Sequence, residues 1–266
     1  MTVNSYLTAI ADDCILRSLR RASINRSVDF IQRRIAGYFG DAVAEQIVFG
    51  SYSRDTILPR TFDANADVDL MVVFKDSSYR PQTYLDRLRR FAESHYSSSE
   101  IRQSHPTVQL DLNHIRFELV PAVRGTVLYS EHFIPSPDSE WSDWMGTNPR
   151  AFNSELIRVN QANSSLTKPL IRILKCWNAQ HGYPFASFEL EKHVVENSSY
   201  GWGGAQRLDS YFYSIVGTLP TFWFGPQWKR DKVSRLNLAV SNARERSRHS
   251  QFLEARIEIL RVLKAA

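Results

Sequence analysis

The sequence of 266 residues predicts an α+β fold, in which a mixed sheet with flanking helices precedes a helical lobe. Two observations lead to this prediction. Between residues 44 and 123, short apolar runs rich in β-branched residues alternate with segments of helical periodicity. After residue 153, apolar residues recur at helical spacing, and no low-complexity linker intervenes. We therefore expect one bilobal unit, with a core lobe at 1–159 and a helical lobe at 160–266.

Apolar spacing, caps and turn residues predict the elements in order. Helices are expected at 5–21, 27–39, 81–96, 153–161, 168–181, 187–196, 206–217 and 250–264. Strands are expected at 44–49, 68–74, 107–112 and 115–123. The last two strands are separated by Asn113-His114, a turn sequence, and therefore form a hairpin. Residues 138–153 are rich in Trp, Asn, Pro and Ser, and we expect an ordered loop there.

Composition narrows the class of protein. Apolar residues make up 43% and charged residues 23%, which is ordinary for a globular chain and excludes a wholly disordered one. The sequence has no apolar run of the roughly 18 residues that a membrane span needs, and no secretory signal, so no membrane partner is expected. Cys14 and Cys176 are too few for a disulfide framework, which favours the reducing cytoplasm. The net charge of +5 favours anionic partners such as nucleotides.

Two carboxylates open the second predicted strand. Asp67 and Asp69 are two residues apart, so on an extended strand their side chains point to the same side. Two like charges at short range repel each other unless a cation lies between them. Oxygen ligands of this kind suit a hard divalent cation such as Mg²⁺. The pair therefore predicts a metal site.

A phosphate site and a third carboxylate are expected beside this pair. Gly50-Ser51 directly follows the first strand, and glycine lets the backbone come close to a ligand. Residues 52–56 would form the first turn of a helix, whose N–H groups attract phosphate. Glu118 is a charged residue inside an apolar strand and is the candidate for the third carboxylate. With two cations, such a site could hold a triphosphate and lower the pKa of an attacking hydroxyl.

Each feature alone fits a plainer structural role. An Asp-x-Asp pair is common in loops and caps, and Glu118 could form a structural ion pair with Arg116 on the same side of the strand. The combination is much rarer. A strand followed by Gly-Ser, an Asp-x-Asp pair opening an apolar strand, and a carboxylate on a later strand together predict a nucleotidyltransferase.

The same residues carry a family resemblance. GSYSRDT followed by DVDLMVVF resembles the polymerase-β-type nucleotidyltransferase fold, and more narrowly the CD-NTases, which are bacterial relatives of cyclic GMP-AMP synthase and oligoadenylate synthase. The narrower resemblance extends over about Ile47 to Val195. It rests on four further stretches, FELVPAV, FIPSPDSEWSDWMGTNPRAFNSELIRVNQ, KPLIRILKCWNAQ and FASFELEKHV.

The resemblance implies an active site in the cleft between a nucleotidyltransferase core lobe and the helical lobe. Asp67 and Asp69 would ligate two ions, Mg²⁺ or Mn²⁺. Glu118 would complete the site nearest the acceptor hydroxyl, where the family usually has Asp. Gly50 and Ser51 would hold the donor triphosphate.

In the helical lobe, the resemblance implies that Lys175 and Ser187 contact phosphates. Without the resemblance, both residues fit purely structural roles. Lys168, Arg172 and Lys175 form one basic stripe, which on an isolated helix is a solvated face. Ser187 suits the N-cap of a helix.

The resemblance implies synthesis of a cyclic or short linear oligonucleotide second messenger from ATP, with GTP, CTP and UTP as further candidates, and release of pyrophosphate. The product would act on a separately encoded effector in anti-phage signalling. Transfer of a nucleotide to RNA or to a protein, and a non-catalytic module that binds nucleotide or RNA, stay open as alternatives. RNA as an activator is also open, although nothing in the sequence indicates it, and a monomer is favoured.

Overall fold

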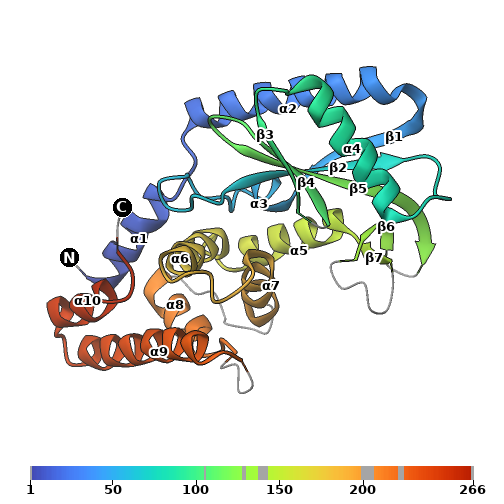
Figure 1. Ribbon diagram of the computed structural model, residues 1–266. Coiled ribbons are helices and arrows are strands. Elements are labelled where there is room, and N and C mark those ends of the chain that lie inside the picture. The colour runs from blue at the N-terminus through green and yellow to red at the C-terminus, as the bar shows by residue number, and fades with distance from the viewer. Residues whose placement is uncertain are drawn as a thin grey trace. The chain divides into compact units, whose positions relative to one another are not determined.

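The computed structural model describes residues 2–104, 106–127, 130–136, 143–198, 207–220 and 225–264. The chain divides into two compact units (Figure 1). One contains Leu16–Arg54 and Asn65–Asn153 and is called the sheet unit here. The other contains Met1–Ile15, Asp55–Ala64 and Ser154–Ala266 and is called the helical unit. The division is thus discontinuous in sequence, because the helical unit is made of three separate segments of the chain.

The sheet unit is built on a mixed sheet, as the sequence predicts. Its strands are β1 (Val43–Phe49), β2 (Asp67–Phe74), β3 (Glu100–Ser104), β4 (Thr107–Asp111), β5 (Arg116–Val127), β6 (Ser130–Pro135) and β7 (Trp144–Thr147). The main path runs β1-β2-β5-β4-β3, while β6 pairs with β5 and β7. Only β2 and β5 are parallel among the described pairs. The predicted 107–123 hairpin is confirmed by the antiparallel pair β4 and β5.

The two faces of β2 have different neighbours. The helices α2 (Ser18–Phe39) and α4 (Pro81–His95) lie over one face (Figure 1). On this face, the centroid of the Phe74 ring lies 5.4 Å from that of Phe39 and 5.0 Å from that of Tyr84. On the other face, Met71 and Val73 form a buried cluster with neighbours on adjacent strands. Since side chains alternate along a strand, Asp67 and Asp69 belong to the face of Met71 and Val73.

The helical unit is built around α6. Its helices are α1 (Val3–Asp13), α5 (Pro149–Ala162, from Ser154 onward), α6 (Thr167–Gln180), α7 (Ser187–Ser198), α8 (Leu208–Val216), α9 (Gln227–Arg248) and α10 (Phe252–Leu260). Helix α6 is buried at Thr167 and at every position from Leu170 to Asn178, so it is enclosed rather than amphipathic at the surface. The Tyr6 hydroxyl donates to the carbonyl of Leu263 at 2.9 Å and ties α1 to the C-terminal segment.

Two expectations about elements are wrong, and several elements were not predicted. The helix expected at 5–21 is two helices, because α1 ends at Asp13 and α2 begins at Ser18, and these helices belong to different units. The loop expected at 138–153 contains β7 and the start of α5, while 137–142 lie outside the described residues. Strand β3 was not predicted because its residues are mostly exposed and lack apolar alternation. Helix α9 was also not predicted, since its long polar sequence carries only a narrow apolar stripe.

The described residues contain no helix that combines the length and the apolarity of a membrane span.

Candidate active site

Asp67 and Asp69 lie at the beginning of β2. Both are half-buried, whereas Val68 and all residues from Leu70 to Phe74 are buried. The apolar residues explain why the strand forms, and the two carboxylates lie where it emerges from the core. Because they are two residues apart on a regular strand, they share one face, as predicted from the sequence.

Glu118 lies on the neighbouring strand, directly opposite Asp69. The parallel register of β2 and β5 pairs Asp69 with Glu118 and Asp67 with Arg116. Neighbouring strands lie about 4.8 Å apart, and paired residues in a parallel ladder project to the same face. The sheet therefore places the three predicted carboxylates on one face, near the beginnings of the inner strands β2 and β5.

The ion pair that offered a plainer role for Glu118 is not formed. Arg116 Nε instead lies 3.0 Å from Asp111 Oδ1. Glu118 Oε1 accepts a hydrogen bond of 2.9 Å from Gln109 Nε2, across the antiparallel pair β4 and β5. The carboxylate of Glu118 is thus held by a neutral amide, and Arg116 does not compensate its negative charge.

The chemistry of this face suits a hard cation, although its geometry is incomplete. Asp67 and Asp69 supply carboxylate oxygens, which divalent cations such as Mg²⁺ prefer. Within the part of the chain that the structure describes, no three His, Cys, Asp or Glu side chains are arranged to hold a metal ion. The fold therefore places a carboxylate pair and a third carboxylate on facing positions without assembling all three into one site.

The backbone of Gly50 lies against the carboxylate of Asp69. A Cβ at Gly50 would lie 1.7 Å from Asp69 Oδ2, a distance that no real contact allows. Gly50 also has φ of +69°, a conformation that favours glycine. Register places Phe49 opposite Asp69, so the chain turns next to the carboxylate. The sequence predicted that the backbone at Gly50 comes close to a ligand. In the structure it comes close to Asp69.

The turn after Gly50 is shorter than predicted. Helix α3 covers only Gly50–Ser53, and Asp55 has φ of +60°, so the helix expected at 52–56 is wrong. The Ser53 hydroxyl donates to the carbonyl of Gly50 at 3.0 Å and closes the single turn. Ser51 is half-buried within it.

Lys175 lies in a buried network in the helical unit. Its Nζ is 3.1 Å from Glu191 Oε1, and the side chains of Lys175 and Glu191 are 5% and 0% exposed. The Thr56 hydroxyl donates to the same carboxylate oxygen at 2.8 Å. Sequence reasoning missed Glu191 and Thr56. The signal was present, because Glu191 is a charged residue on the same helix face as Val194 and Val195.

The basic stripe on α6 is not a solvated face, so that alternative is wrong. Lys168 Nζ lies 3.2 Å from Asp55 Oδ2. Arg172 is buried and donates to the carbonyls of Asp55 at 3.2 Å and Ala11 at 3.3 Å. Burial lowers the pKa of Arg172, although nearby groups that favour its charged form act to raise it. Lys168 and Arg172 therefore hold the segment that begins at Asp55.

Ser187 is the first residue of α7 and is half-buried. The N–H of Leu190 bonds to the carbonyl of Ala186 at 3.1 Å, so Ala186 holds the position before the helix. The N-cap role expected for Ser187 is therefore wrong, and its hydroxyl lies in the first turn.

Comparisons with known proteins identify the family. The model of the SMODS domain, the Second Messenger Oligonucleotide or Dinucleotide Synthetase domain, matches residues 1–160. A probable cyclic nucleotide synthase of Bacillus cereus (strain VD146), IK1_05630, is 25% identical to this chain. That match covers 74% of this chain and 71% of the relative.

Solved structures share the fold. CdnC of E. coli MS115-1, solved with ATP, has a TM-score of 0.73 at 13% identity, with 97% of this chain and 96% of that chain covered. DncV of Vibrio cholerae, a cyclic AMP-GMP synthase solved with the linear intermediate pppA(3′,5′)pG, has a TM-score of 0.76 at 11% identity, with 99% and 95% covered. The predicted α+β nucleotidyltransferase fold is thereby confirmed. Since the domain model matches more than half of the chain, the protein belongs to the SMODS family of CD-NTases, nucleotidyltransferases that synthesise oligonucleotide second messengers.

Proposed function

We propose that Asp67, Asp69 and Glu118 form the catalytic site at which nucleoside triphosphates are joined into a cyclic or short linear oligonucleotide with release of pyrophosphate. The observation that carries this proposal is the parallel register that sets Glu118 opposite Asp69, on the same sheet face as Asp67. The contact between Gly50 and Asp69 supports it, since it places a glycine turn beside the carboxylates.

Asp67 and Asp69 would hold two divalent cations, Mg²⁺ or Mn²⁺. When bound, such ions neutralise charge on the triphosphate and lower the pKa of the acceptor hydroxyl. Gly50 and Ser51 would donate backbone N–H groups to the donor phosphates, because an open helical turn leaves its first N–H groups without intrahelical partners. Glu118 would complete the site on the acceptor side once its carboxylate leaves the amide of Gln109.

Lys175 and Ser187 are our candidates for phosphate contacts from the helical unit. Lys175 is buried in its pair with Glu191, so contact with a phosphate requires that it exchange this partner. Ser187 is accessible without such a change, because it is half-buried at the start of α7. We therefore expect Ser187 to act on substrate affinity and Lys175 to act on both affinity and stability.

We propose ATP as a substrate, with GTP, CTP and UTP as further candidates. Solved relatives bind ATP in the case of E. coli CdnC and GTP in the case of the CdnG of Bradyrhizobium diazoefficiens. We also propose a cytoplasmic enzyme that acts in anti-phage signalling through a separately encoded effector, with a monomer favoured. The two buried free thiols, Cys14 and Cys176, support a reducing compartment.

The test is incubation of the purified protein with labelled nucleoside triphosphates and Mg²⁺ or Mn²⁺, followed by phosphatase and chromatography. We expect a phosphatase-resistant product that disappears in Asp67→Ala/Asp69→Ala. Asp76→Asn is the matched control, because Asp76 is an exposed aspartate just beyond the end of β2. Omitting one triphosphate at a time identifies the bases. A product that persists in the double variant contradicts the proposal.

One observation favours a second candidate, a module that binds nucleotide without turnover. Glu118 is engaged by Gln109, and the described carboxylates do not assemble into a three-ligand site. In the same assay, this candidate predicts affinity for nucleotide but no incorporation. Label that appears on added RNA or protein would instead indicate transfer to a macromolecular acceptor.

A further inference from the structure

Gln109 lies on the face of the sheet that carries the three candidate carboxylates, which is called the catalytic face here. Its Nε2 donates a hydrogen bond of 2.9 Å to Oε1 of Glu118. The other carboxylate oxygen, Oε2, has no hydrogen-bond partner among the described residues. Glu118 is half-buried, so its carboxylate is held at one oxygen and is still accessible.

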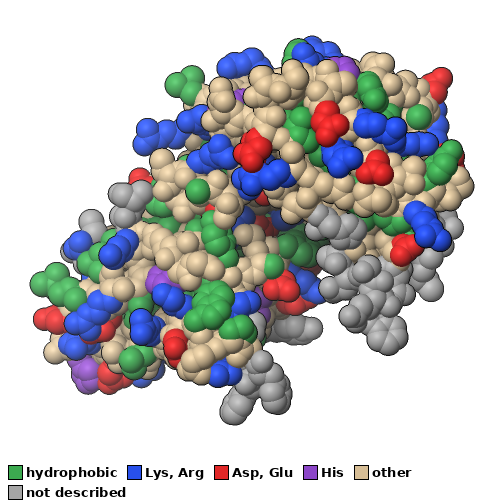
Figure 2. Space-filling view, viewed as in Figure 1, with side chains coloured by type: hydrophobic (Ala, Val, Ile, Leu, Met, Phe, Trp, Pro, Cys, Tyr) green, Lys and Arg blue, Asp and Glu red, His purple; other side chains and the backbone are tan. Residues whose placement is uncertain are grey.

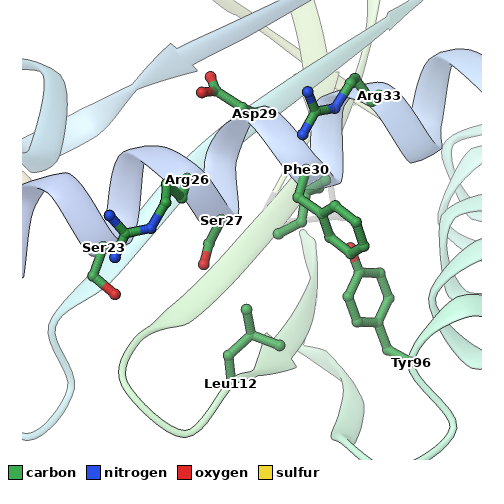
Figure 3. A pocket seen from close by; sticks show the side chains of 9 residues that line it. Ser23, Arg26, Ser27, Asp29, Phe30, Arg33, Tyr96 and Leu112 are labelled. Carbon is green, nitrogen blue, oxygen red and sulfur yellow. The ribbon is translucent and has the colours of Figure 1, made fainter.

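The opposite face of the sheet is covered by helices. Figure 3 shows Leu112, which directly follows β4, facing Ser27 of α2 across a cavity of about 400 Å³. Figure 2 shows Lys and Arg side chains at the surface over α2, so the helix and not the sheet forms the surface there. Since side chains alternate along a strand, Gln109 and Asp111 belong to the catalytic face. Gln109 therefore shares a face with Glu118.

Asp69, Glu118 and Gln109 form a row across three adjacent strands. The strand order places β5 between β2 and β4. Register pairs Glu118 with Asp69 on one side and with Gln109 on the other. Neighbouring strands lie about 4.8 Å apart, so Asp69 and Gln109 lie on opposite sides of Glu118. A Glu118 carboxylate that bonds to Gln109 is therefore drawn away from Asp69.

The backbone that carries Gln109 is held in place. Four register pairs join β4 to β5. The turn between these strands is anchored on α2, because Ser27 Oγ lies 3.1 Å from His114 Nε2. Since both strands are held, rotation of the side chains alone can separate Gln109 from Glu118.

The bond to Gln109 suits a chain that has no cation on the catalytic face. Asp69 and Glu118 are like charges on neighbouring strands, and each disfavours the ionised form of the other. An amide N–H stabilises the Glu118 carboxylate on the side away from Asp69. With a divalent cation held by Asp67 and Asp69, Glu118 would gain more from that charge than from a neutral amide.

We propose that Gln109 is a positioning residue that holds Glu118 away from Asp69 in the metal-free chain and releases it when a divalent cation is bound. This inference rests on the proposed function, in which Asp67 and Asp69 hold the cation. The amide and the cation compete for one carboxylate. Gln109 therefore weakens cation binding, and Glu118 joins the site only in the loaded enzyme.

The test is a titration of the full chain with Mn²⁺ in the absence of nucleotide, in which electron paramagnetic resonance measures the free ion. Gln109→Met removes the amide donor and keeps the length of the side chain. We expect it to tighten Mn²⁺ binding by about tenfold, because a hydrogen bond to a charged group no longer competes for Glu118. Gln109→Lys should weaken binding, since an ammonium group holds the carboxylate more strongly and repels the ion. In the incorporation assay, the Mg²⁺ concentration for half-maximal rate should shift in the same direction for each variant.

Two controls isolate the role of Glu118. Gln103→Met changes a glutamine of β3 whose side chain exchanges hydrogen bonds with Gln82 of α4, and it should leave the affinity for Mn²⁺ unchanged. In a Glu118→Gln background, Gln109→Met should also have no effect, because no carboxylate is left to release.

The proposal is overturned if Gln109→Met binds Mn²⁺ no more tightly than the natural chain does. It is also overturned if Gln109→Met tightens binding equally in the Glu118→Gln background. A gain in Mn²⁺ affinity without any nucleotide incorporation would support the role of Gln109 and contradict the proposed function. Incorporation together with an unchanged Mn²⁺ affinity in Gln109→Met would support the proposed function and contradict the role of Gln109.

Discussion

Gly50 and Asp69 are in direct contact, and the contact leaves no room for a side chain at position 50. A Cβ there would lie 1.7 Å from Asp69 Oδ2 and 2.6 Å from its carboxyl carbon. The glycine turn and the Asp-x-Asp strand, which are separate features of the sequence, therefore form one structural unit. The position of Asp69 depends on the absence of a side chain at Gly50.

Gly50→Ala is expected to lower nucleotide incorporation by about 100-fold, because the added methyl group must displace the Asp69 carboxylate by about an ångström or more. The positive φ of Gly50 adds a backbone cost of about 1 kcal/mol. The measurement is the initial rate with saturating triphosphate, beside a melting curve. Gly37→Ala is the matched control, since a Cβ at Gly37 meets nothing within 4 Å. In that helical position alanine should leave the rate unchanged and add roughly 0.5–1 kcal/mol of stability. A Gly50→Ala enzyme with the natural rate would contradict this account of Asp69.

Glu118 and Asp69 face each other across β2 and β5, so they should act in the same step. We expect Glu118→Gln and Asp69→Asn each to lower incorporation by about 100-fold or more, since each removes a carboxylate that would bind the metal. Glu118→Asp should retain more activity than Glu118→Gln, because it keeps the charge. The double variant Asp69→Asn/Glu118→Gln should be little worse than either single variant. Fully multiplicative losses would mean that the two residues act independently.

Features of the fold that depend on residues close together in the sequence could be predicted, whereas features that depend on distant residues could not. The strand that begins at Asp67 was predictable because its apolar run specifies a buried strand wherever it packs. The shared face of Asp67 and Asp69 follows from strand geometry alone. The position of Gln109 opposite Glu118 follows from the predicted hairpin, because a two-residue turn at Asn113-His114 fixes this register. The hydrogen bond between the two side chains is a finding of the structure.

The same reasoning explains the errors in the helical unit. A solvated face was expected for Lys168 and Arg172 because the spacing of residues shows which side chains share a helix face, but not which other elements pack against that face. Their partner Asp55 lies over a hundred positions earlier in the sequence, in a segment that belongs to the same unit. The break between α1 and α2 escaped prediction because apolar spacing continues across it while the two helices pack in different units.

The buried pair of Lys175 and Glu191 makes a prediction about stability. Lys175→Met should lower the free energy of unfolding by about 3–5 kcal/mol, because it removes the buried ammonium group that lies 3.1 Å from the Glu191 carboxylate. Adding Glu191→Leu should recover much of the loss, since the double variant removes both charges of this pair. Thr56→Val, which removes one hydrogen bond to Glu191, should cost about 1 kcal/mol.

Urea unfolding of these variants provides the measurement, and the exposed pair Lys192 and Glu196 provides the control. Lys192→Met should change the free energy of unfolding by less than about 0.5 kcal/mol, because an exposed ion pair contributes little. Equal losses in Lys175→Met and Lys192→Met would show that burial of the first pair has no energetic consequence.

His132 makes a prediction about pH. Burial lowers its pKa below the usual 6.5, its side chain is 4% exposed, and its Nδ1 is buried without a hydrogen-bond partner among the described residues. Below the unfolded-state pKa, the unfolded chain therefore binds a proton that the folded chain resists, and stability falls as the pH decreases from about 6.5. We expect His132→Leu to reduce this loss, measured as the difference in urea midpoint between neutral pH and about pH 5.5. The pH dependence of stability that remains should come in part from His181 and His193, because burial also lowers the pKa of each of these residues. An unchanged pH dependence in His132→Leu would mean that this imidazole is protonated equally in both states.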